Sequence, residues 1–180
     1  MRKTLSAVDP APAVAGMQAT GVLASILPGA DPMFLAPLVH LETEANIQPD
    51  PIRRFAVLGE EGIVERMRLK KSETKDLDLL RTLIGDPMET AAVAWRHGVD
   101  IAWSAQLLRQ AMSGQPLSPR ASDRITLGSN AKFPIAASDL IDRVQGKELG
   151  DALRRAEQIW IESDFNLSKA VLIETVFKEG

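Results

Sequence analysis

The sequence predicts an all-α protein, an array of roughly nine or ten short helices that ends in a helical tail subdomain. Apolar residues recur three and four positions apart, as in Leu77, Leu80 and Leu83, and this spacing places them on one face of a helix. Aspartate-proline pairs and single glycines interrupt these periodic runs, as is typical of helix starts and ends. The alternation of apolar and polar residues that is typical of strands is nearly absent. Together these observations favour a fold built from helices alone.

Aspartate-proline pairs predict helix starts in the first half of the chain. An aspartate at the N-cap accepts a hydrogen bond from a free backbone N–H, and proline at the first helical position lacks the N–H that would have no partner there. Glycines after periodic runs predict helix ends, because a left-handed residue is favoured just beyond a helix. The predicted starts are Asp9-Pro10, Asp31-Pro32, Asp50-Pro51 and Asp86-Pro87, and the predicted ends are Gly85, Gly98 and Gly114.

The second half of the chain is divided by a segment, 114–134, that is rich in Gly, Pro, Ser and Asn and predicts a long loop. We therefore expect a helical body region over 1–113 and a helical tail subdomain over 135–180. The last helix of the tail is expected to run from Leu167 to Lys178, with Asn166 as its cap.

The composition matches an ordinary globular protein and excludes several kinds of chemistry. The 180 residues contain no cysteine, which excludes disulfides, thiolate zinc sites and cysteine nucleophiles and suits a reducing cytoplasm. Two histidines are too few for a histidine-rich metal site. The apolar stretch 14–26 contains glycines and polar residues and is too short to span a bilayer. Because the formal net charge is −3, any site for a polyanion has to be a local basic cluster.

Carboxylate pairs are the most frequent groups with catalytic potential in the sequence. A two-metal transferase places such a pair at the end of a strand, beside a glycine-rich phosphate loop. The pairs here, for example Glu42 with Glu44, follow no strand and no such loop, so we interpret them as solvated helix faces. We therefore predict no catalytic residue, no metal site and no cofactor site within these 180 positions.

The aromatic residues and the histidines are expected to be structural. Trp95, Trp103 and Trp160 lie at helical spacing among aliphatic residues, so we predict that they pack in the core and do not stack on bases. His40 is expected to be a partly buried core residue, and His97 is expected to assist the end of a helix.

The strongest local charge feature is a run of four cations within six residues: Arg66, Arg68, Lys70 and Lys71. Cations at a helix C-terminus complement the helix dipole, so an ordinary helix end is one interpretation. The other is a stripe that follows RNA phosphates, to which the preceding helix would add Arg53 and Arg54. That pair has its own alternative, in which the aliphatic stems lie over core residues.

A second candidate phosphate site lies at the start of the long tail helix. Gly146 stands where backbone N–H groups are exposed, and Arg143 and Lys147 flank it. In the structural alternative, Gly146 relieves a tight turn and Gly150 allows a close helix crossing.

Several segments together resemble one protein family. In the tail, these are FPIAASDL at 133–140, GKELG at 146–150 and AEQIWIESDF at 156–165. Upstream, they are VDPAPA at 8–13, TGVL at 20–23, DPIRRFA at 50–56 and MRLKKS at 67–72. In this order and spacing they are similar to the C-terminal part of bacterial CCA-adding tRNA nucleotidyltransferases, in the alphaproteobacterial type that is also labelled poly(A) polymerase.

The resemblance implies a helical body and tail that hold tRNA. In that family a separate N-terminal head adds nucleotides to the tRNA 3′ end, with magnesium and with CTP or ATP. No such head is present in this sequence, so we expect a C-terminal fragment that is inactive alone and has tRNA and its own head as partners. The resemblance also implies that Arg143 and Lys147 face the tRNA.

Two functions of different classes stay open. The first is a cytoplasmic tRNA-binding fragment of a tRNA nucleotidyltransferase. The second is a helical interaction or dimerisation scaffold without a direct RNA role, in which the chain forms a homodimer. Neither function involves a membrane. A basic concave stripe that joins the two clusters would favour the first, and a large exposed apolar patch would favour the second.

Overall fold

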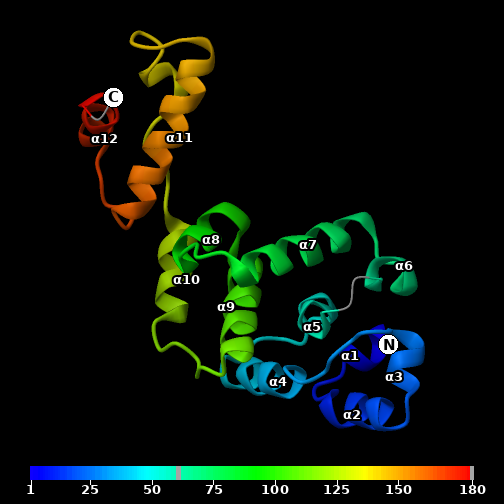
Figure 1. Ribbon diagram of the computed structural model, residues 1–180. Helices are drawn as coiled ribbons and strands as arrows, with labels where there is room; N and C mark the ends of the chain where they lie inside the picture. Colours follow the sequence, from blue (N-terminus) through cyan, green and yellow to red (C-terminus); the bar gives the residue numbers. More distant parts are fainter. Residues whose placement is uncertain (60–61, 179–180) are drawn as a thin grey trace. The chain divides into compact units, whose positions relative to one another are not determined.

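The computed structural model describes residues 1–59 and 62–178. This part of the chain is 68% helical and contains no strand. Figure 1 shows the helices along the chain. The all-α prediction is confirmed. The described residues form twelve α-helices, nine of them with seven or more residues, together with one 3-10 helix, η1. Three helices of four or five residues are too short for a periodic pattern to reveal. The elements are α1 (Arg2–Leu5), α2 (Ala11–Ala19), α3 (Val22–Ile26), α4 (Leu35–Glu44), α5 (Pro51–Leu58), α6 (Ile63–Met67), α7 (Lys71–Gly85), α8 (Thr90–His97), α9 (Val99–Ser113), α10 (Ala121–Asn130), η1 (Ala137–Asp139), α11 (Gly146–Glu162) and α12 (Lys169–Lys178).

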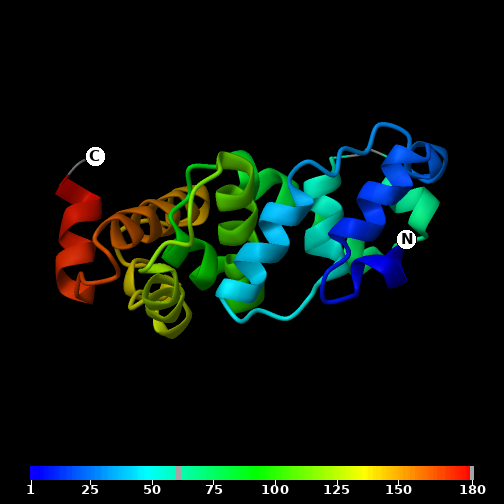
Figure 2. The same cartoon turned by 90° about the horizontal axis from the view of Figure 1, so that it is seen from below.

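The chain divides into two compact units, Met1–Thr126 and Leu127–Gly180, which are described separately. In the first unit, α9 packs against α4, α5, α7 and α8, and Figure 2 shows α4 lying beside it. Leu107 and Leu108 of α9 are fully buried, as are Phe55 of α5 and Leu80 of α7, and all four belong to one apolar core. The first unit is therefore organised around α9.

All four Asp-Pro pairs form the same local hydrogen bond, although only one stands directly at a helix cap in the expected way. In each pair the aspartate Oδ1 accepts from the backbone N–H two residues later, at 3.0, 2.9, 2.8 and 2.7 Å in chain order. Asp50 is the N-cap of α5, with Pro51 at its first position. After Asp31 and Asp86 a short turn intervenes before the helix begins. The hydrogen bond expected of each aspartate thus forms, while the helix begins up to one turn later than predicted.

Two of the predicted helix ends carry a left-handed glycine. Gly114 follows α9 with φ of 66°. Gly98, with φ of 87° and ψ of 171°, ends α8 and also precedes the first residue of α9. Because only glycine adopts the Gly98 conformation readily, two helices meet there without a loop.

The segment 114–134 is not the loop that the sequence predicts, because α10 occupies ten of its residues. Ala121 and Ile125 are four positions apart and both are buried, so one face of this helix packs on the protein although the segment is rich in polar residues. Gly128, which favours a break in the sequence pattern, lies inside the helix. The boundary between the two units consequently falls within α10.

The second unit is held together by a helix pair and an aromatic cluster. Buried residues on α11 face buried residues on α12, which pairs with it. Trp160 is buried, and its ring makes edge contacts with the rings of Phe133 and Phe165 at centroid distances of 5.4 and 4.9 Å. The core role predicted for Trp160 is confirmed.

The last helix begins later than the sequence predicts. It starts at Lys169, and Asn166 does not cap it, because the Asn166 side chain donates to the backbone oxygen of Ser163 at 3.3 Å. Lys169 pairs with Asp139 at 2.6 Å.

Candidate functional site

Arg53 and Arg54 do not face solvent, so the prediction that they extend a phosphate-binding stripe is wrong. They are only 3% and 1% exposed. Arg53 Nε donates to Glu42 Oε1 at 2.7 Å, and Arg54 Nη2 donates to Glu42 Oε2 at 2.6 Å. One carboxylate thus binds both guanidiniums inside the protein and compensates one of their two positive charges. The interpretation of Glu42 as a solvated residue is also wrong, since it is buried between the two arginines.

The remaining donors of Arg54 attach the N-terminus of the chain to the core. Its Nη1 donates to the backbone oxygen of Leu5 at 2.7 Å and its Nη2 to that of Val8 at 3.0 Å. These carbonyls lie at and after the end of α1, where a helix leaves backbone acceptors without intrahelical partners. The role of Arg54 is therefore structural, and the guanidinium is not available to a phosphate.

The four cations between α6 and α7, which we call the basic segment, are all exposed: Arg66, Arg68, Lys70 and Lys71. Met67 and Leu69, which lie between them in the sequence, are half-buried and pack against the core. Arg68 has a left-handed conformation with φ of 51°, and the N–H of Leu69 donates to the oxygen of Val64 at 3.0 Å, which closes the end of α6. Met67 and Leu69 thus hold the segment on the core, while the four cationic side chains face solvent.

The acidic residue nearest to Lys70 and Lys71 is already paired with another cation. Glu73 accepts the N–H of Lys70 at 2.8 Å and receives two bonds from Arg2, at 2.5 and 2.7 Å. The hydrogen bond from Arg2 lowers the pKa of Glu73 from its usual 4.5 to about 2. Through its bond to the N–H of Lys70, Glu73 also caps α7. Within the described part of the chain, none of the four cations of the basic segment has an ion pair of its own.

In the second unit, Arg143 and Lys147 are both exposed at the start of α11. The guanidinium carbon of Arg143 lies 5.1 Å from the centroid of the Phe177 ring, a cation-π contact. Beside them, a cavity of about 500 Å³ is lined in part by the carboxylates of Glu148 and Asp151. This surface is therefore mixed in charge, and the basic segment is the more uniformly positive of the two candidates.

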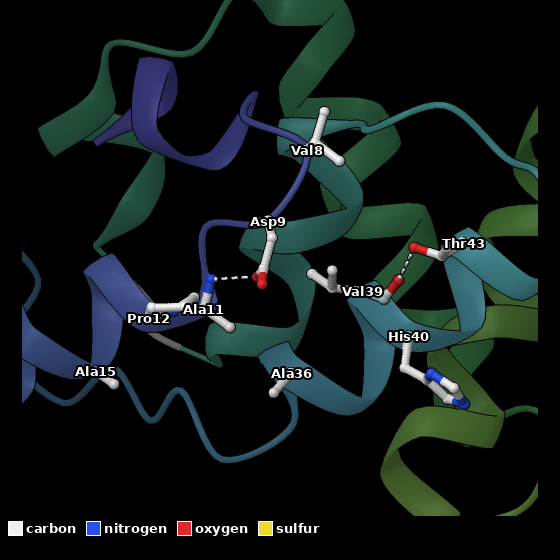
Figure 3. Close-up of a pocket in the computed structure, with 9 residues that line it drawn as sticks. All are labelled: Val8, Asp9, Ala11, Pro12, Ala15, Ala36, Val39, His40 and Thr43. Atoms are coloured by element: carbon white, nitrogen blue, oxygen red, sulfur yellow. Dashed lines mark hydrogen bonds between the residues drawn. The ribbon is translucent and has the colours of Figure 1, made fainter.

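An apolar groove of about 560 Å³ opens between α2 and α4 (Figure 3). Two of its polar side chains form local hydrogen bonds: Asp9 accepts from the N–H of Ala11 at 3.0 Å, and Thr43 donates to the oxygen of Val39 at 2.9 Å. His40 is exposed at the edge, not partly buried as predicted, and Figure 3 shows its ring directed away from Asp9. The groove therefore offers no acid-base pair.

The α2 side of the groove lies in a stretch of the chain without charged side chains. Residues 10–30 contain no Asp, Glu, Lys, Arg or His, although a quarter of the chain is charged. In α2 only Val14 is buried, so the other apolar side chains of that helix lie wholly or partly in solvent. Val8 and Met33, which flank this region in the sequence, are 79% and 61% exposed. We call residues 10–30 the uncharged segment.

A second cavity in the first unit, of about 400 Å³, lies between the α4–α5 connection and the start of α9. Its lining includes Asp50 and Arg53 on one side and Asp100, Trp103 and Ser104 on the other. Trp103 is half-buried, so it has both the predicted contact with the core and a surface toward this cavity. The sequence pattern does not predict this site, because its two groups of lining residues are about fifty positions apart in the chain. The one local signal for it is the three-residue spacing of Asp100 and Trp103.

Within residues 1–59 and 62–178, no group of three or more His, Asp and Glu side chains is arranged to hold a metal ion. No helix among them is long and apolar enough to cross a bilayer. Comparison with protein-family models, with curated proteins and with solved structures gave no significant match.

Proposed function

We propose that the chain is an RNA-binding helical module that holds RNA phosphates through the basic segment. The observation that carries the proposal is the exposure of all four cations without an intramolecular ion pair in the described residues. Arginine and lysine in such a cluster release counterions when they bind phosphates, which makes binding favourable and salt-dependent. The acidic net charge of the chain is compatible with this, because phosphate contacts are local.

The resemblance to CCA-adding enzymes favours tRNA as the RNA. On that basis the chain would be the cytoplasmic body and tail of a tRNA nucleotidyltransferase. Nucleotide addition with magnesium and CTP or ATP would then belong to a separate head domain. Arg143 and Lys147 would add a second, weaker contact on the other unit.

Salt-dependent binding to tRNA tests this proposal. The variant in which Arg66, Arg68, Lys70 and Lys71 are replaced by Glu is compared with the unchanged chain by fluorescence anisotropy over a series of salt concentrations. Each lost phosphate contact lowers the slope of log K against log salt by about 0.7 to 0.9, so four contacts correspond to a decrease of about 3. A second variant, Arg143→Glu with Lys147→Glu, measures the contribution of the other cluster.

A matched control changes the net charge equally without touching the basic segment. It replaces four exposed cations that are dispersed in the sequence, Arg120, Lys132, Arg154 and Lys178, by Glu. We expect the control to lower the slope by much less than the first variant. Equal slopes for the unchanged chain and the first variant, with the helical circular dichroism signal preserved, would reject the RNA-binding role of these residues.

The uncharged segment favours a second candidate function, a dimerisation or protein-interaction scaffold. An exposed apolar surface of this kind is typical of an interface. The scaffold function predicts that the mass measured by light scattering after size-exclusion chromatography rises with concentration to that of a dimer. Val22, which is 44% exposed in this segment, supplies the test variant: Val22→Glu would abolish the dimer without unfolding the protein. A monomer at all concentrations contradicts a homodimer.

A further inference from the structure

The cavity beside Trp103 combines an aromatic wall with a carboxylate that has no partner. Asp100 and Trp103 are three positions apart on α9 and therefore lie on the same face of the helix. Asp100 is exposed, and its carboxylate makes no hydrogen bond or ion pair with another described residue. The volume of about 400 Å³ is within the range of small-ligand sites.

The lining of the cavity also includes a buried donor. Arg53 lines the cavity and is only 3% exposed. A guanidinium has five N–H groups, and three of them have acceptors: Glu42 at 2.7 Å, Ser104 Oγ at 3.2 Å and the backbone oxygen of Gln48 at 2.7 Å. One N–H on each terminal nitrogen is left without an acceptor among the described residues. The cavity is thus lined by an indole, by a carboxylate without a partner among the described residues, and by a buried guanidinium of which two N–H groups have no acceptor among the described residues.

Among the RNA bases, guanine matches this set. Its N1–H and 2-amino group are adjacent donors that a carboxylate accepts with both oxygens, and its O6 and N7 are adjacent acceptors that a guanidinium binds. Adenine and cytosine each place one amino donor beside a ring-nitrogen acceptor, and uracil has a single N–H between two carbonyls. Every base stacks on an indole, so stacking adds affinity without choosing the base.

We propose that this cavity binds an unpaired guanine base, stacked on Trp103, with its donor edge toward Asp100 and its acceptor edge toward Arg53. As a site on RNA this rests on the proposed function, in which the basic segment holds the phosphates. The base pocket then adds a sequence preference that phosphate contacts lack.

Isothermal titration calorimetry of the full chain with GMP, AMP, CMP and UMP tests the proposal. All four ligands carry the same phosphate, so differences between them report on the base. We expect saturable binding of GMP, with the other three at least about tenfold weaker, because a bidentate contact discriminates by about that factor or more. IMP, which lacks the 2-amino donor, should bind more weakly than GMP. Equal affinity for the four nucleotides, or no saturable heat with GMP at millimolar concentration, overturns the proposal.

Asp100→Asn replaces one acceptor of the carboxylate by a donor, at an exposed position where the fold is not at risk. It should weaken GMP about tenfold or more and reduce the preference over AMP. The matched control is Asp123→Asn, which removes an exposed aspartate from the first turn of α10, outside this cavity. If Asp100→Asn binds GMP as tightly as the control does, the assignment of the donor edge to Asp100 is wrong.

The two proposals fail separately. The charge-reversal variant of the basic segment should show a salt slope for tRNA binding that is lower by about 3 while it retains GMP binding. Asp100→Asn should weaken GMP binding about tenfold or more while it retains the salt slope for tRNA. GMP binding that disappears in the basic-segment variant would assign the base site to that segment and overturn the cavity proposal.

Discussion

The buried contact of Glu42 with Arg53 and Arg54 makes the strongest prediction about stability. Glu42→Gln removes the negative charge and replaces one carboxylate oxygen by an amino group that faces a guanidinium. Both arginines then stay buried without a counter-ion, and the loss of one member of a buried ion pair costs about 3–5 kcal/mol. This is a large part of the roughly 5–15 kcal/mol that stabilises a typical domain.

Urea unfolding followed by circular dichroism at 222 nm measures this effect. With an m-value of about 2 kcal/mol per molar urea, the midpoint of the first unit should fall by about 1.5–2.5 M. The m-value itself should not change, since the same surface is exposed on unfolding. Trp95 and Trp103 belong to the first unit and Trp160 to the second, so tryptophan fluorescence helps to assign the two transitions if they separate.

Glu44→Gln is the matched control, because Glu44 lies on the same helix but is exposed. It should change the free energy of unfolding by less than about 0.5 kcal/mol. A loss below about 1 kcal/mol for Glu42→Gln would refute the reasoning, since it would mean that the guanidiniums do not depend on the carboxylate for their burial.

Three further predictions follow from single contacts. The hydrogen bond from Arg2 lowers the pKa of Glu73 from 4.5 to about 2, so the stability it contributes is present above pH 4.5 and is lost as the pH falls from about 4.5 to 2. Because the pair is partly exposed, it should contribute at most about 1 kcal/mol to the free energy of unfolding. In Glu73→Gln the melting temperature should therefore fall less between pH 6 and pH 2 than it does in the unchanged chain. Gly98→Ala should lower the free energy of unfolding in urea by about 1–3 kcal/mol, because residue 98 has a φ of 87°. Gly16→Ala is the matched control: residue 16 lies inside α2 with open space around it, so this change should raise the free energy of unfolding by up to about 1 kcal/mol. Arg109 donates to three backbone oxygens, at 2.8, 2.8 and 2.9 Å, between the end of α7 and α8, so Arg109→Ala should cost about 3 kcal/mol, and an unchanged urea midpoint would contradict this.

The local chemistry of the sequence determined the fold class and the approximate position of most long helices. Asp50 caps α5 because its carboxylate reaches an N–H two residues away, an interaction that needs no tertiary contact. Gly98 and Gly114 end helices because the backbone conformation there is available to glycine alone at low cost. Such features depend on neighbours within four residues and can be read from the chain in order.

The tertiary structure decided which charged residues remain on the surface. Arg53 and Arg54 look like surface cations in the sequence, and they are buried because Glu42, on the preceding helix, supplies a carboxylate to both. The local pattern also gave a wrong prediction for α10. There the packing of Ala121 and Ile125 outweighs a polar, glycine-containing sequence. The Trp103 cavity likewise exists only where the α4–α5 connection meets α9. The physical reason is the same in each case. A charge or an apolar face is buried only where a partner distant in the chain contacts it, and the free energy of that contact exceeds the secondary-structure preference of the local sequence.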